Sequence, residues 1–229
     1  MADLARRRVL RSLALGAAAF AATTTLPGCQ PAIMLGRVLF GDTKIAPPLT
    51  QFTGIELEAG EHPVHLACSA PATVLADYDA LQVDLVEEVA RRLRKREIPV
   101  TPPDEVLEHI DALGGRFDAR ELAAQFGEGP LIHLDIERFS LVESSGSDLH
   151  RGRLVGELTA YELREATEDG TWDGGAVEIF TQEVRLEYPS THPLPADQVS
   201  PRMFKRKFMA ALADEIGRRL YSYRVSDTF

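Results

Sequence analysis

In the first half of the chain, short continuous apolar runs are interspersed with segments in which hydrophobic residues have helical spacing. Residues 64–68 form a short apolar run, which predicts a buried strand. Over 79–96, leucine and valine recur every four residues, which predicts an amphipathic helix. A short second strand over 98–100 and helices over 103–113 and 118–127 are expected to follow. The order strand, helix, strand favours a right-handed parallel unit.

The second half of the chain has the period of two that is typical of half-exposed strands. Three long alternating segments, 130–143, 151–163 and 176–188, are separated by turns rich in serine and glycine. They predict an antiparallel meander. A last helix is expected to start at Ser200-Pro201. We therefore expect an α/β fold of the α+β kind: a mixed β-sheet with a βαβ N-terminal part, a C-terminal antiparallel three-strand meander and packing helices.

The N-terminus has the pattern of an export signal. Arg6 and Arg7 begin a basic cluster, and an uncharged run from Ser12 to Leu26 follows it. A basic segment before a short apolar run is typical of signal peptides, and this run is too short to span a membrane comfortably. The arginine pattern is similar to a twin-arginine signal, and general secretion is the alternative route. Residues 1–28 are thus predicted to be a signal peptide.

The signal ends in Leu26-Pro27-Gly28-Cys29, which resembles the lipobox of bacterial lipoproteins. In those proteins the cysteine thiol receives a diacylglyceryl group, and a peptidase then cuts just before it. Gly28 is the small residue that this cleavage needs, whereas Pro27 departs from the usual pattern. The resemblance implies a lipid anchor on Cys29, and Gln30 after it implies the outer membrane, with the protein facing the periplasm. A plain signal peptide with an incidental cysteine is the alternative.

Residues 29–63 are rich in glycine and proline without a sustained period, and they are predicted to be a tether and a lead-in segment. Residues 64–229 are expected to form a single α/β domain. The hydrophobic content of 45% and the charged content of 26% are those of a globular protein. A formal net charge of −10 argues against a nucleic-acid partner. With only Cys29 and Cys68, no disulfide framework is implied.

Three alternate positions of one predicted strand, His133, Asp135 and Glu137, are candidate metal ligands. A strand would project all three from one face, and an imidazole with two carboxylates can bind zinc or iron. The same face is expected to continue with Phe139 and Leu141. We favour a solvated sheet face on which acids pair with arginines of neighbouring strands, and we expect no cofactor. The neighbouring strands offer Arg153, Glu157, Glu183, Arg185 and Glu187.

Trp172 lies between glycines at an expected hairpin tip and is a candidate anchor for a protein partner. Packing of this side chain back onto the sheet is the alternative. The sequence contains no nucleophile elbow, no glycine fingerprint for dinucleotides and no Cys-x-x-Cys pair. We therefore expect no catalytic residues.

The order of predicted elements behind a lipobox resembles the domain shared by the curli secretion lipoprotein CsgG, the N-terminal domain of TolB and LpoB-type activators of peptidoglycan synthases. This similarity in fold covers about residues 64–223. The chain is also similar to a group of planctomycete-type envelope lipoproteins of no known activity. The motifs that carry this second similarity are Pro103-Asp104-Glu105-Val106-Leu107, Phe139-Ser140-Leu141, Leu149-His150-Arg151-Gly152-Arg153 and Tyr188-Pro189.

These resemblances imply a non-catalytic envelope lipoprotein, an adaptor or assembly module that faces the periplasm. We expect it to bind an envelope protein through its sheet edge or its hairpin loops. The resemblance assigns no residue to partner contact. The alternative function is a ligand- or metal-binding envelope protein, or a hydrolase, that uses the face of His133, Asp135 and Glu137.

Overall fold

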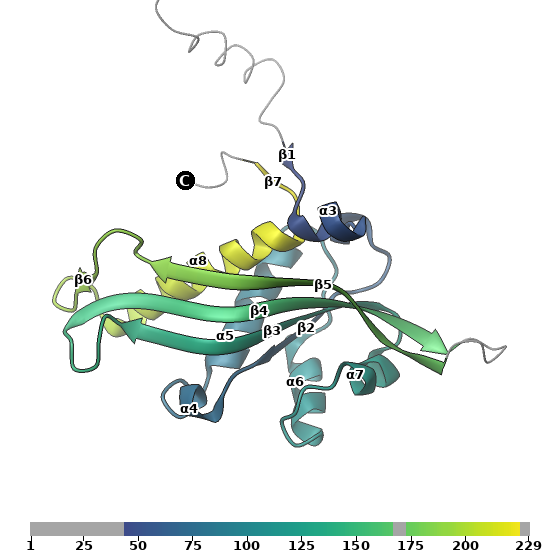
Figure 1. Cartoon of the computed structure of the whole chain (residues 1–229), viewed down its shortest axis with the longest axis horizontal. Helices are drawn as coiled ribbons and strands as arrows, with labels where there is room; N and C mark the ends of the chain where they lie inside the picture. Colours follow the sequence, from purple (N-terminus) through teal and green to yellow (C-terminus); the bar gives the residue numbers. More distant parts are fainter. Residues whose placement is uncertain (1–43, 167–172, 225–229) are drawn as a thin grey trace, which may run out of the picture. The chain divides into compact units, whose positions relative to one another are not determined.

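The computed structural model describes residues 44–166 and 173–224 (Figure 1). Its main sheet has the strand order β2-β3-β4-β5, and a short strand, β6, also pairs with β4. The parallel pair is β2 with β3, and the pairs β3–β4 and β4–β5 are antiparallel. The strands of this sheet are β2 (His65–Ser69), β3 (Gly129–Val142), β4 (Leu149–Ala166), β5 (Asp173–Tyr188) and β6 (Leu194–Pro195).

Helices pack against the sheet, and the predicted mixed sheet with an antiparallel meander is confirmed. Two further short strands, β1 (Lys44–Ile45) and β7 (Tyr223–Arg224), form a two-stranded sheet. A 3-10 turn lies at Leu57–Ala59. The helices are α3 (Pro48–Thr53), α4 (Ala72–Leu75), α5 (Leu81–Arg94), α6 (Pro103–Ala112), α7 (Ala119–Phe126) and α8 (Pro201–Leu220).

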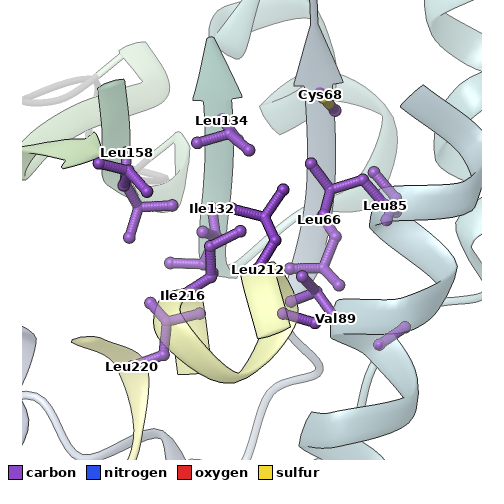
Figure 2. Close-up of a cluster of buried hydrophobic side chains, with 14 of the residues drawn as sticks. Leu66, Cys68, Leu85, Val89, Ile132, Leu134, Leu158, Leu212, Ile216 and Leu220 are labelled. Carbon is purple, nitrogen blue, oxygen red and sulfur yellow. The ribbon is translucent and has the colours of Figure 1, made fainter. Parts of the chain in front are cut away.

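The main core lies between one face of the sheet and the two long helices, α5 and α8. The four-residue repeat in α5 gives it one apolar face, which buries Leu85 and Val89. Figure 2 shows how these side chains meet alternate residues of the strands and the apolar face of α8. The labelled members of this cluster from the strands and α8 are Leu66, Cys68, Ile132, Leu134, Leu158, Leu212, Ile216 and Leu220.

A smaller core lies on the opposite face of the sheet, under α6 and α7. Val106, Ile110 and Leu122 of these helices are buried against residues that point the other way from the main core. Those residues are Ala67, Leu131 and Leu163. Because side chains alternate along a strand, the two cores share the same strands.

The compact unit spans Lys44–Tyr223. Leu49 of α3 and Leu57 are both buried in the main core. The later part of the predicted tether and lead-in segment therefore contributes to the core of the fold.

Two helix starts confirm the sequence prediction. The carboxylate of Asp118 accepts hydrogen bonds from the backbone N–H of Arg120 (3.0 Å) and of Glu121 (3.5 Å) at the start of α7. At the start of α8, the hydroxyl of Ser200 accepts from the N–H of Met203 (3.4 Å). Each cap satisfies backbone donors that a helix leaves without partners.

The short strand predicted over 98–100 is wrong in extent. Within this segment only Val100 forms a β-bridge. Its partner is Val64, the residue just before β2, and the bridge is parallel and isolated. The extended parallel partner of β2 is β3, and the crossover between them contains α4 to α7.

A β-bulge at Glu137 changes which face the later residues of β3 occupy. The register passes from Ile136 opposite Gly156 to Arg138 opposite Val155, so Glu137 has no partner on β4. The prediction that Phe139 and Leu141 continue the face of His133 is therefore wrong. Phe139 is instead buried in the main core, where its ring centroid lies 5.6 Å from that of Phe208.

We expect Gly156→Ala to lower the free energy of unfolding by about 2 kcal/mol, because an added methyl group would overpack the bulge. A Cβ at this position would lie 2.5 Å from the backbone oxygen of Asp135, and backbone atoms cannot move aside easily. The measurement is urea unfolding followed by circular dichroism. Gly60→Ala is the control, because its Cβ would meet nothing nearer than 3.5 Å. Equal losses in the two variants would contradict this account.

Candidate functional site: the polar face of the sheet

Ser69, His133 and Asp135 form a hydrogen-bonded cluster on the polar face, by which we mean the face of the sheet opposite α5 and α8. The parallel register places Ala67 beside His133 and Ser69 beside Asp135, so the three polar side chains project from the same face. The Ser69 Oγ lies 2.7 Å from His133 Nε2. The same hydroxyl donates to Asp135 Oδ1 at 2.8 Å.

The proton count of the hydroxyl fixes the roles in this cluster. Ser69 has one O–H, and it is donated to Asp135, so His133 Nε2 must donate its own N–H to Ser69 Oγ. In a hydrolytic triad the histidine lies between the serine and the acid and accepts the serine proton. Here the serine lies in the middle, and the histidine is not positioned as its base. The arrangement links two strands and holds Asp135 in place.

His133 is buried, contrary to the solvated face that we favoured for it. Only 7% of the residue is exposed, and its ring stacks on Phe117 with centroids 3.6 Å apart and planes 3° apart. Burial lowers the pKa of His133 to about 4, although the nearby Asp135 carboxylate acts in the opposite direction. The imidazole is therefore neutral at pH 7 and serves as a flat, hydrogen-bonding member of the smaller core.

The three candidate metal ligands are not brought together. Ser69 joins His133 to Asp135, whereas Glu137 lies in the bulge and interacts electrostatically with Arg185 on β5. Across residues 44–166 and 173–224, no three or more histidine, cysteine, aspartate or glutamate side chains are grouped as a metal ion requires. The sequence does contain a signal for the bulge. In Ile136-Glu137-Arg138-Phe139 two charged residues follow one another, which breaks the alternation of apolar and polar residues in a regular strand.

Charged side chains on the rest of the polar face divide into two groups. Asp135, Glu157 and Glu183 lie directly opposite one another on β3, β4 and β5. Like charges in this position repel. Arg185 offsets part of this repulsion through its ion pair with Glu183. Beyond the bulge, acids and arginines pair as expected, with Arg153 Nη2 2.7 Å from Glu143 Oε2 and Arg151 Nε 3.0 Å from the same atom.

Cys68 lies on the opposite face of β2 and is buried in the main core. Burial, and secondarily the charge of Asp135, raises the pKa of its thiol far above the usual range, so it is protonated and unreactive. This agrees with its interpretation as a small core residue. The other sequence-predicted site residues, Arg6, Arg7, Cys29 and Trp172, lie outside the described residues.

One edge of the sheet is open along β5. Over the described residues, β5 pairs with β4 on one side and has no strand on the other. Phe52 of α3 lies beside this strand, 78% exposed, with its ring centroid 6.2 Å from that of Phe180 on β5. A hollow of about 580 Å³ includes Ile179 of β5, Leu163 and Ile55 in its lining. The position of α3 could not be foreseen, because its segment lacks a sustained period.

No family model matches the sequence, and no curated protein matches it. Three bacterial lipoproteins of known crystal structure are similar to the chain in structure. Lipoprotein GNA1162 from Neisseria meningitidis is 10% identical, with a TM-score of 0.39, and the match covers 68% of this chain and 98% of that one. A minor lipoprotein from Acinetobacter baumannii is 12% identical, with a TM-score of 0.27 and coverage of 70% and 96%. The rare lipoprotein B from Shewanella oneidensis is 16% identical, with a TM-score of 0.25 and coverage of 67% and 91%.

At this level of similarity the three structures assign no activity or location to this chain. Among the helices of residues 44–166 and 173–224, none has both the length and the apolar composition needed to cross a membrane.

We expect the stability of the protein to fall between pH 6.5 and pH 4 because His133 is buried as a neutral ring. In the unfolded chain a histidine takes up a proton near pH 6.5, whereas His133 in the folded chain does so only near pH 4. Acid therefore favours the unfolded state, and the full loss from this group is about 3 kcal/mol. Urea unfolding at pH 7.5 and at pH 4.5 measures it.

The variant His133→Phe retains a flat ring against Phe117 and removes the titrating group, so its stability should depend less steeply on pH over this range. His192→Phe, at an exposed histidine, is the matched control and should keep the wild-type slope. An unchanged slope in His133→Phe would show that burial of this ring does not control acid stability.

Proposed function

We propose that this protein is a non-catalytic envelope lipoprotein that binds a protein partner along the open edge of β5. The observation that carries the proposal is the combination of an unpaired strand edge with an exposed aromatic side chain beside it. The edge strand is 16 residues long, and Phe52 lies next to it with most of its surface in solvent.

An open strand edge offers a row of backbone N–H and C=O groups to an incoming extended segment. Backbone hydrogen bonds of this kind supply affinity, and side-chain pockets beside the strand supply specificity. The hollow would accept a side chain of such a segment. Its lining combines the apolar Ile55, Leu163 and Ile179 with the acidic Glu56, Glu61, Glu128 and Glu162. Charged side chains on β5, among them Glu183 and Arg185, disfavour unspecific pairing between copies of the chain.

A lipid anchor at Cys29 would hold the protein on the membrane, and the proposed location is the periplasmic side of the outer membrane. This part of the proposal is supported by the basic cluster, the uncharged run and the lipobox-like Leu26-Pro27-Gly28-Cys29, followed by Gln30. Two or three acyl chains provide enough buried hydrocarbon for stable anchoring.

We expect Cys29→Ala to move the protein from the membrane fraction to the soluble fraction of the envelope, or to halt its processing, because the thiol is the atom that is acylated. Fractionation with immunoblotting, together with mass spectrometry of the mature N-terminus, measures this. Cys68→Ala is the matched control, because it removes a buried thiol and should leave the protein with the membrane. Membrane recovery of an unacylated Cys29→Ala protein equal to that of the wild type would refute lipid anchoring.

We expect a photo-crosslinking residue at Phe52 or Gln182 to capture one and the same envelope protein in intact cells. The same residue placed at Arg116, on the α6–α7 side, should not capture it, since that site lies on the opposite face of the sheet from α3 and Phe52. Phe52→Asp should lower the crosslinking yield from position 182 several-fold, because it replaces the exposed aromatic ring beside β5 with a charge. Equal capture from positions 52, 182 and 116 would contradict binding at this edge.

A further inference from the structure

A cleft of about 850 Å³ lies beside α5 and the first half of α8. Five residues of α8 line it. Arg202, Lys205, Arg206 and Met209 are spaced three and four apart, so they form one face of the helix, and Met203 lies next to them. The α5 residues that line it have the same spacing and are Asp84, Glu87, Glu88, Arg91 and Arg94. Charged faces of α5 and α8, which are far apart in the sequence, therefore both line this cleft.

Basic side chains are in excess in this cleft, although the chain as a whole has a net charge of −10. Lys205 Nζ pairs with Asp84 Oδ2 at 2.6 Å, and Glu88 is bound by Arg91 and Arg92. Among the described residues, no carboxylate pairs with Arg94, Arg202 or Arg206. These three arginines face a single remaining carboxylate of the lining, that of Glu87.

The cleft also has an apolar part. Met203, which is 40% exposed, lies among the arginines, and the guanidinium of Arg206 contacts its sulfur at 3.0 Å. Met209 and Pro103 extend this apolar lining. Arginines around exposed methionine suit a ligand that carries an anionic group next to hydrocarbon.

We propose that this cleft binds the phosphate-bearing headgroup of an anionic membrane lipid. Arginine is the side chain best suited to phosphate, because its planar group donates two parallel hydrogen bonds to phosphate oxygens. The choice of a lipid over another phosphate rests on the proposed anchoring at Cys29 and on the apolar part of the cleft. At physiological ionic strength charges are screened within about 8 Å, so acids elsewhere on the protein do not cancel this local excess.

The test uses the predicted mature chain, residues 29–229, carrying Cys29→Ala, so that neither the basic signal segment nor an acyl chain contributes to binding. Co-sedimentation is measured with phosphatidylcholine vesicles and with vesicles that also contain phosphatidylglycerol. We expect stronger binding to the second kind, falling with added salt, and a loss of about tenfold or more in the partition coefficient for Arg94→Glu/Arg202→Glu. The matched control is Arg116→Glu/Arg120→Glu, which changes the net charge equally on the α6–α7 side of the sheet. All four arginines are exposed, so the variants are expected to fold.

Loss of binding in the cleft variant with retention in the control supports the proposal. Equal loss in both variants would show that net charge alone decides binding, and wild-type binding that does not depend on phosphatidylglycerol would equally overturn the proposal. Binding of inorganic phosphate or polyglutamate without vesicle binding would assign the cleft to a soluble anion or an acidic protein segment instead. None of these results bears on acylation, because anchoring at Cys29 is measured separately by fractionation.

Discussion

The burial of one face of β3 against α5 and α8 is the constraint on which the rest of the structure depends. Ile132, Leu134 and Ile136 occupy that face and pack with the apolar side of α5 and α8. Because side chains alternate along a strand, their burial forces His133 and Asp135 onto the opposite face. There the parallel neighbour β2 presents Ser69 at the height of Asp135. The polar cluster is thus a consequence of the main core.

The same constraint shows why the polar face is not uniform. Next to α6 and α7, a neutral His133 lies flat against Phe117 and belongs to a small core. Two residues further along β3, on the same face, Asp135 is exposed and lies in a row with Glu157 and Glu183. The bulge at Glu137 then turns Phe139 inward, and arginines take over the exposed positions. Burial, charge and pairing therefore change within a few residues of one strand.

Much of the architecture could be predicted from local patterns. The four-residue repeat of α5 and the caps of Asp118 and Ser200 depend on nearby residues, and the structure confirms them. The burial of His133 could not be predicted, because it depends on where the loop before α7 places Phe117. The cleft between α5 and α8 was also beyond prediction. Its arginines are separated in the sequence by more than a hundred residues, and each set alone is typical of a solvated helix.

The pairing of β2 with β3 has a consequence for the order in which the chain folds. Ser69 and Asp135 are 66 positions apart, so their strands can meet only after a long loop has closed, and such closure is costly in entropy. The hairpin of β4 and β5 involves neighbouring segments and requires no such closure. Folding is therefore expected to begin in the antiparallel half, and the parallel strand to join a sheet that is already partly assembled.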